Sequence, residues 1–347
     1  MRQSSNHCRP RSPHLGWLAA FPWFVLTLCS AAAEQPASTL PAEQSEIVFT
    51  KRNSPTDAPM HIGFSAAMFA GLNSSDARNS IKALTVSIAR EVDIIADPDP
   101  LIYENTDEAE NILHRHLIGA ISMTTSEYWL LRRNVEFNRF LINTRKESAV
   151  GTYLLLTREG SDISSLADLK GKKLIVYSSP AMCLATAWLD VELAKKTLPQ
   201  TTVLLGNVTE FAKPTKVVLP VFFGQADACL ITRYSFDTMV ELNPQVGRQL
   251  RIIATSPEFI TTLFGFRADL SSALTEKSIL AFVKLRSSIA GRQTLAIFKT
   301  EDIAEGNATD FDSSLALLDE HARLCPEAST ALIASLRGLH SSPLPMP

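Results

Sequence analysis

The sequence predicts an α/β protein built as two lobes, and three observations support this expectation. Strand-like and helix-like segments alternate between about residues 60 and 300, a pattern typical of α/β layers with mainly parallel strands. The length of 347 residues suits two domains or one large bilobed domain. A β-prone run at 150–157 separates two alternating units. Two lobes leave a cleft, and ligands bind in such clefts, beyond the carboxyl ends of parallel strands.

Composition excludes several classes of protein. Hydrophobic residues make up 46% of the chain and charged residues 20%, which excludes wholesale disorder, a coiled coil and a polytopic membrane protein. The net charge of −3 provides no basic surface for nucleic acid. No two of the 14 glycines fit the G-x-G pattern of a dinucleotide-binding fingerprint, and Gly171-Lys172 lacks the upstream glycine that a Walker loop requires. We therefore expect neither a nucleic-acid partner nor a cofactor.

The first 33 residues are typical of a secretory signal peptide. Arg2, Arg9 and Arg11, with no acidic residue among them, precede an apolar run at 15–29. Ala31-Ala32-Ala33 then provides small residues for cleavage. The run is short for a membrane span, which disfavours an uncleaved anchor. Leu28 occupies the position where a lipoprotein signal needs a small residue, so we do not expect Cys29 to be lipidated. Without residues 1–33 the chain has 30 basic and 36 acidic side chains, which predicts an exported, mildly acidic protein.

Two further segments are expected to lie outside the fold. Residues 34–58 are rich in Ala, Pro, Ser, Glu and Gln and predict a flexible leader. Residues 331–347, which end in a run of Ser and Pro, predict a flexible tail.

The first lobe is expected to follow a βαβαβα order. Strands are predicted at 61–65, 93–96 and 117–123, and helices after 73–76, over 106–117 and over 127–134. Residues 73–76 and 124–126 have the side chains that cap helix N-termini. The second helix carries Asp107, Glu108 and Glu110 in its first turn, where the helix dipole favours acidic side chains.

The second lobe is expected to repeat this alternation. In this lobe, strands are predicted at 173–177, 202–205 and 226–232, and helices at 164–172, 181–189 and 214–223. Later in the chain, strands are predicted at 250–254 and 263–267 and a helix at 274–289. Gly171 closes the first of these helices, and Pro220 bends the third. Ser178-Ser179-Pro180 caps the helix at 181–189.

Two motifs resemble a known family. The string LADLKGKKLIV at 166–176, followed by a serine pair, resembles the entry into the second lobe of type 2 periplasmic substrate-binding proteins. The string FGQADA at 223–228 is similar to a later strand of the same lobe. The group that the chain resembles is the phosphate/phosphonate-type binding proteins of ABC importers.

The resemblance implies a Venus-flytrap fold of type 2 with hinge strands. The first lobe would comprise 59–155 and 256–330, and the second lobe would be inserted at 156–255. Two hinge crossings would lie at 150–157 and 250–255. Such a protein captures a small solute in the periplasm, as a monomer, and delivers it to the permease of an ABC transporter. The sequence leaves the identity of the solute open.

Two other functions are compatible with the same fold. The protein could present its closed form to a membrane sensor kinase or cyclase instead of a permease. It could also be a secreted enzyme that uses Cys183 or a pair of carboxylates, although no such site is visible in the sequence.

Polar residues at two predicted helix starts are the main candidates for solute binding. An oxyanion needs donors already in place, since leaving water costs several kcal/mol unless hydrogen bonds replace hydration, and a helix N-terminus offers free N–H groups. These candidates are Thr124, Thr125 and Ser126 in the first lobe and Ser178 and Ser179 in the second. The alternative is that both groups are ordinary N-caps, each contributing about 1 kcal/mol to helix stability.

Four more residues are candidates because they lie near predicted strand ends. Ser65 and Tyr128 could donate hydroxyl groups in the first lobe, although Tyr128 could equally be a half-buried packing residue. Arg233 and Tyr234 follow the strand at 226–232. Arg233 could pair bidentately with a carboxylate or phosphate, or it could form a surface or hinge ion pair.

No catalytic or metal-binding constellation is predicted. His114 and His116 are two residues apart on a helix and point to different faces, so they form no metal-binding pair. Three cysteines remain after the leader, Cys183, Cys229 and Cys325. A disulfide between the first two and three buried thiols are both open alternatives.

Overall fold

The computed structural model describes residues 61–69, 74–92, 99, 101–145, 148–297 and 300–339. The predicted signal peptide, the predicted leader at 34–58 and the predicted strand at 93–96 lie outside these residues. None of the helices within these ranges combines the length and the apolar character that a membrane span requires.

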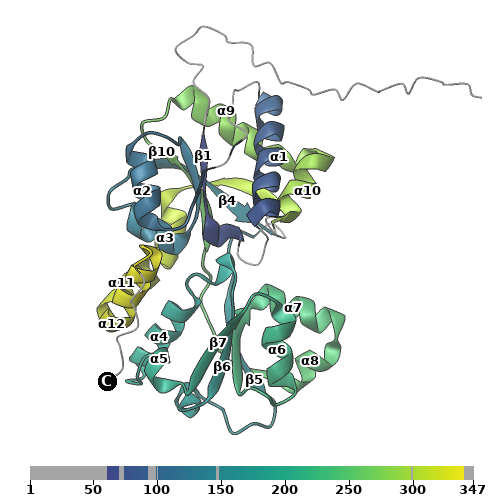
Figure 1. Ribbon diagram of the computed structural model, residues 1–347. Coiled ribbons are helices and arrows are strands. Elements are labelled where there is room, and N and C mark those ends of the chain that lie inside the picture. Colours follow the sequence, from purple (N-terminus) through teal and green to yellow (C-terminus); the bar gives the residue numbers. More distant parts are fainter. Residues whose placement is uncertain are drawn as a thin grey trace, which may run out of the picture. The chain divides into compact units, whose positions relative to one another are not determined.

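The first sheet brings together strands from both halves of the sequence (Figure 1). Its order is β11 (Asp302–Gly306), β4 (Phe137–Thr144), β10 (Thr262–Arg267), β3 (Ala120–Thr124), β1 (Ile62–Ser65) and β2 (Leu101–Tyr103). Strand β1 pairs in parallel with β2 and β3, whereas β10 is antiparallel to β3 and β4, and β4 is antiparallel to β11.

Alternating side chains give the first sheet two separate apolar faces. Successive residues of a strand point to opposite faces, so Phe140 and Ile142 of β4 enter one core while Leu141 enters the other. Figure 1 shows different helices on the two sides of the sheet. One side carries α2 (Thr106–His114) and α3 (Thr125–Leu131), and the other carries α1 (Ser74–Val92), α9 (Ser272–Val283) and α10 (Ile289–Ile297).

The second sheet is formed by the middle of the chain. Its order is β7 (Asn207–Phe211), β6 (Lys173–Tyr177), β8 (Ala228–Thr232), β5 (Tyr153–Arg158) and β9 (Leu250–Thr255). The helices that flank it are α4 (Ala185–Lys195), α5 (Thr201–Leu204), α6 (Pro214–Phe222), α7 (Arg233–Leu242) and α8 (Pro244–Gln249). The central strands are buried on both faces, which explains their nearly unbroken apolar sequence.

Two C-terminal helices, α11 (Asp312–Leu324) and α12 (Pro326–Leu336), connect the two lobes. Helix α11 packs on α3 of the first lobe and on α4 of the second. Trp129 of α3 donates from Nε1 to Asp319 Oδ1 at 2.7 Å. His321 is buried, with its Nε2 3.3 Å from Oδ2 of Asp190 in α4. The same α11 helix is therefore hydrogen-bonded to both lobes.

The predicted two-lobed α/β fold is confirmed, but the expectation of mainly parallel strands is corrected. Both sheets are mixed, because β4 and β10 in the first and β5 and β9 in the second run antiparallel to their neighbours. The strands β5 and β9 belong to the second sheet, so the chain passes between the sheets at 145–152 and 256–261.

Three predicted elements are corrected. Residues 202–205 lie mostly in helix α5, and the strand follows at Asn207–Phe211. The helix expected directly after Ser179 begins at Ala185, behind a three-residue 3₁₀ turn at Pro180–Met182. The tail expected from residue 331 starts too early, because α12 continues to Leu336.

We predict that Asp190→Ala strongly destabilises the fold. Asp190 is buried and accepts a hydrogen bond from Thr201 N at 2.6 Å as well as facing His321. The substitution leaves buried polar partners without an acceptor, so we expect the free energy of unfolding in urea to fall by about 2–5 kcal/mol.

Glu192→Ala in the same helix is the matched control. Its carboxylate is partly exposed and lies 3.4 Å from Lys195, so its loss should cost less than about 1 kcal/mol. Equal losses in the two variants would contradict the assignment of Asp190 as the buried link between α4 and α11.

Candidate functional site

The predicted site residues lie at the polar edges of the two sheets. In the first sheet, β1 ends at Ser65 and the parallel β3 ends at Thr124. In the second sheet, Ser178 follows β6 and Arg233 follows the parallel β8. These are the carboxyl edges at which open α/β sheets bind ligands.

The turns after β3 and β6 contact each other directly. Ser126, at the start of α3, donates from Oγ to the backbone oxygen of Cys183 at 3.1 Å. The thiol of Cys183 lies 3.2 Å from the backbone oxygen of Thr261, just before β10. The contact therefore joins a first-lobe turn to the second-lobe turn that also contains Ser179.

Both helix starts at this contact are short. Helix α3 spans Thr125–Leu131, and the turn after Ser179 spans only Pro180–Met182. The expectation that backbone N–H groups at these two helix starts bind an anion stays a prediction. We consider the side chains at this contact as the donors.

Glu127 fixes the first-lobe edge. Its carboxylate is buried and accepts from Ser65 Oγ at 2.6 Å, from Thr124 N at 2.7 Å and from Thr124 Oγ1 at 2.8 Å. The backbone N–H of Glu127 returns a bond to Thr124 Oγ1, which completes a capping box. Burial raises the pKa of Glu127, although the hydrogen bonds from Ser65 and Thr124 act in the opposite direction.

Most first-lobe candidates are consequently occupied by bonds within the protein. The hydroxyl groups of Ser65 and Thr124 donate to Glu127. Thr125 donates from Oγ1 to Ile260 O at 2.7 Å. These residues shape the edge, and they could donate to a solute only after releasing these bonds.

Tyr128 faces away from the turns. Its ring lies in an aromatic cluster with Phe137, Phe140 and Phe311, at centroid distances of 5.9, 5.5 and 5.6 Å. This placement corresponds to the packing alternative, so Tyr128 is left out of the site that we propose below.

The second-lobe candidates are less constrained. The Oγ of Ser179 is buried and, among the described residues, has no hydrogen-bond partner. Ser178 bonds through its backbone N–H to Phe211 O at 3.0 Å. Arg233 and Tyr234 are both exposed, and the guanidinium carbon of Arg145 lies 4.0 Å from the centroid of the Tyr234 ring.

Sequence reasoning missed Glu127 and Arg145. The Thr124-x-x-Glu127 spacing is a capping-box signature and could have identified the glutamate. No local pattern marks Arg145, since its neighbour Tyr234 is 89 positions away along the chain.

The structure offers no support for redox or metal chemistry in the residues it describes. Cys183, Cys229 and Cys325 are free thiols, so the possible disulfide between the first two is not formed. Burial raises the pKa of Cys183 to about 11 and that of Cys229 to about 12, which disfavours reactive thiolates. No cluster of His, Cys, Asp and Glu within the described ranges could hold a metal.

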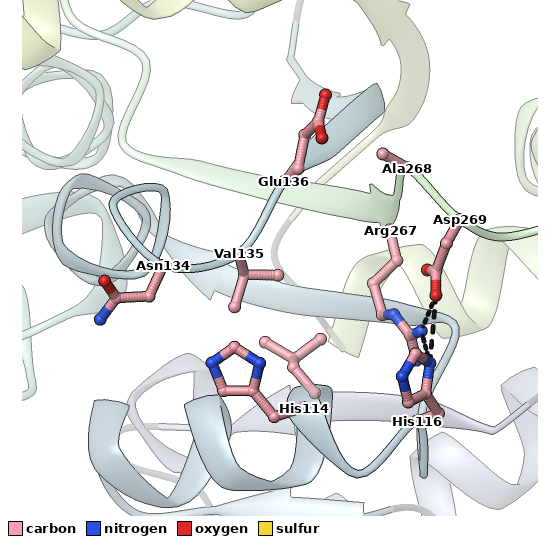
Figure 2. Close-up of a pocket in the computed structure, with 9 residues that line it drawn as sticks. His114, His116, Asn134, Val135, Glu136, Arg267, Ala268 and Asp269 are labelled. Atoms are coloured by element: carbon pink, nitrogen blue, oxygen red, sulfur yellow. Dashed lines mark hydrogen bonds and ion pairs between the residues drawn. The ribbon is translucent and has the colours of Figure 1, made fainter.

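A cavity of about 340 Å³ lies at the opposite edge of the first sheet (Figure 2). Figure 2 shows Arg267, His116 and Asp269 meeting at one side of it. Arg267 is nearly buried and donates from Nη1 to Ile118 O at 3.0 Å. None of the nine predicted site residues lines this cavity.

We predict that Glu127 makes folding less favourable as the pH rises. The folded-state pKa of Glu127 lies above its ordinary value of 4.5, so the folded chain keeps a proton that the unfolded chain has released. The free energy of unfolding should therefore fall as the pH rises from about 4.5 through the folded pKa. Urea unfolding at a series of pH values should show this component in the wild type and not in Glu127→Gln.

Glu241→Gln, at an exposed position of α7, serves as the control. A change with pH in the difference between Glu127→Gln and the wild type that is no larger than the change for Glu241→Gln would contradict the raised pKa of Glu127.

Many solved structures share this fold, among them the following three. A Xanthomonas citri protein bound to chloride ion is 16% identical, with 77% of this chain and 99% of that chain covered and a TM-score of 0.57. A binding protein component of an ABC phosphonate transporter from Pseudomonas aeruginosa is 14% identical, with 82% and 97% covered and a TM-score of 0.54. PhnD1 from Prochlorococcus marinus, in complex with methylphosphonate, is 12% identical, with 76% and 97% covered and a TM-score of 0.52.

The comparison with family models assigns the chain more specifically. A search of curated proteins gave no match. The model described as "ABC transporter, phosphonate, periplasmic substrate-binding protein" matches residues 72–311, more than half of the chain. Proteins of this description are transport proteins that bind a small solute and work with a permease, not enzymes. The chain belongs to this family of periplasmic substrate-binding proteins.

Proposed function

We propose that the protein captures a small oxyanion between the two sheet edges and delivers it to the permease of an ABC importer. The observation that carries this proposal is the contact of the two strand-end turns, Ser126 Oγ to Cys183 O at 3.1 Å. A solute bound beside this contact would touch both lobes, so its binding would favour the state in which the lobes are together.

Ser179 supports an oxygen-bearing solute. A buried hydroxyl without a partner costs about 1–3 kcal/mol, and Ser179 Oγ is such a group in the described part of the chain. An oxyanion would accept its hydrogen. Ser179 belongs to the turn that contacts Ser126, because Cys183 lies only four positions further along the chain.

The remaining donors would come mainly from the second lobe. Arg233 and Ser178 follow the ends of β8 and β6, whereas Tyr234 would contribute its ring and not its hydroxyl group. A guanidinium group binds phosphate-like and carboxylate groups through two parallel hydrogen bonds. Ser65, Thr124 and Thr125 would shape the first-lobe wall, and Ser126 would contribute through its contact with Cys183.

The relatives agree with an anionic solute. The Prochlorococcus marinus protein is described with methylphosphonate and the Xanthomonas citri protein with chloride ion. Both are anions, and we extend this class of ligand, not a particular compound, to this chain.

We predict that one small oxyanion raises the melting temperature of the protein. A ligand present at about 100 times its Kd adds about 2.7 kcal/mol to the free energy of unfolding. The panel should contain phosphate, phosphite, methylphosphonate, methanesulfonate and acetate. An unchanged melting temperature with every anion would contradict the proposed function.

Ser179→Ala should separate binding from stability. The substitution removes a hydroxyl group without a protein partner, so the melting temperature of the free protein should stay the same or rise. The affinity for the anion should fall about 10-fold or more, the loss expected for one hydrogen bond to a charged group. Ser287→Ala, at an exposed first-lobe position, should change neither; an unchanged affinity in Ser179→Ala would exclude Ser179 from the site.

A further inference from the structure

The backbone of Arg145 is held in place at the polar edge of the first sheet. Thr262 pairs with Thr124 on one side and accepts a bond from Asn143 Nδ2 at 3.1 Å on the other. Arg145 follows shortly after Asn143 and exchanges two backbone hydrogen bonds with Ser148, at 2.8 and 2.9 Å. Its backbone is thereby held at the edge that carries Thr124.

The side chain of Arg145 reaches the edge of the second sheet. Its guanidinium carbon lies over the ring of Tyr234, 4.0 Å from the centroid. Tyr234 is in the first turn of α7, whose start is held by Arg233 N donating to Thr152 O at 2.9 Å. A cation over an aromatic face is attracted by the ring quadrupole, and this contact does not use up the N–H donors of the guanidinium.

Neither Arg145 nor Arg233 has a carboxylate within 4.0 Å among the residues that the structure describes. Six arginines of the described part of the chain are paired with a carboxylate, namely Arg132, Arg139, Arg267, Arg286, Arg323 and Arg337. Others in the described ranges, such as Arg248, also lack one, so it is the position of Arg145 and Arg233 at the contact of the two lobes that sets them apart. Two guanidinium groups at the meeting point of two lobes, with their charges uncompensated by carboxylates, have the chemistry of an oxyanion site.

We propose that Arg145, placed on the ring of Tyr234, is the cationic anchor of the solute site and that with Arg233 it selects dianionic oxyanions over monoanions of the same shape. This inference rests on the proposed function, because it requires an anion between the two edges. Each guanidinium attracts every negative charge of the solute, so a second negative charge adds to the attraction from both. Arg145 belongs to the first lobe and Tyr234 to the second, so the anchor also couples binding to closure.

Calorimetric titration of the full mature chain tests this assignment. The probes are methylphosphonate and methanesulfonate, which share a shape and, at mildly alkaline pH, differ by one negative charge. We expect the wild type to bind methylphosphonate at least 10-fold more tightly. Arg145→Ala should weaken methylphosphonate binding at least 10-fold and reduce that preference, and Arg145→Lys, which keeps the charge without the planar fork, should lie between the two.

Variants of Tyr234 test whether its ring positions the guanidinium of Arg145. Tyr234→Phe keeps the ring and should bind methylphosphonate like the wild type, whereas Tyr234→Leu should bind it several-fold more weakly. A loss of methylphosphonate affinity in Tyr234→Phe as large as that in Tyr234→Leu would overturn this role of the ring. Melting curves of the free variants establish that each is folded.

Arg248→Ala is the matched control for charge. Arg248 is an exposed arginine of α8, just before β9 begins, at the edge of the second sheet that is opposite to Tyr234. Arg248→Ala should leave the affinities for methylphosphonate and methanesulfonate within 2-fold of those of the wild type.

The outcomes separate this inference from the function on which it rests. A wild type that binds none of the anions overturns the proposed function and the anchor with it. A wild type that binds methylphosphonate while a folded Arg145→Ala binds it within 2-fold overturns the anchor alone. A wild type that binds methanesulfonate as tightly as methylphosphonate overturns the selection of dianions.

Discussion

The carboxylate of Glu127 is the constraint on which the geometry of the first-lobe edge depends. It collects hydrogen bonds from the end of β1, through Ser65, and from the end of β3, through Thr124. Burying a carboxylate is costly, and three short bonds from two strand ends offset that cost only while the strands keep their register. Thr125 and Ser126, the first two residues of α3, thereby reach Ile260 and Cys183.

The C-terminal helices place a second constraint on the lobes. Besides the chain crossings at 145–152 and 256–261, α11 is hydrogen-bonded to Trp129 in the first lobe and contacts Asp190 in the second. Buried apolar residues of α4 and α11 belong to one continuous core. Any change in the angle between the lobes must therefore repack or pivot about α11, and this helix begins after residue 311, where the family match ends.

The sequence predicted most of the strands and missed β2, β4, β7 and β11, of which β4 lies inside the first sheet. Strands such as β5 and β8 are buried on both faces and have apolar runs that reveal them. Strand β7 lies at a sheet edge and its five residues are all exposed, so it has no apolar run from which a strand could be predicted. The apolar residues before it form α5 instead. Among the site residues, Ser179 and Arg233 were found from their place after strands, whereas the pairing of Arg145 with Tyr234 depends on a contact that no local pattern encodes.

The two walls of the candidate site differ in how their polar groups are used. In the first lobe, Ser65, Thr124 and Thr125 already donate to protein acceptors, so this wall is rigid and has little left to offer a solute. In the second lobe, Ser179 and Arg233 have no such acceptors among the described residues. Donors that are already satisfied gain little from an anion, whereas a desolvated, unpartnered hydroxyl gains a full hydrogen bond. The exposed Arg233 gains a charge-assisted bond in exchange for its hydration. The affinity of such a site would therefore come from the second lobe and from Arg145, and the first-lobe wall would set the shape of the solute that fits.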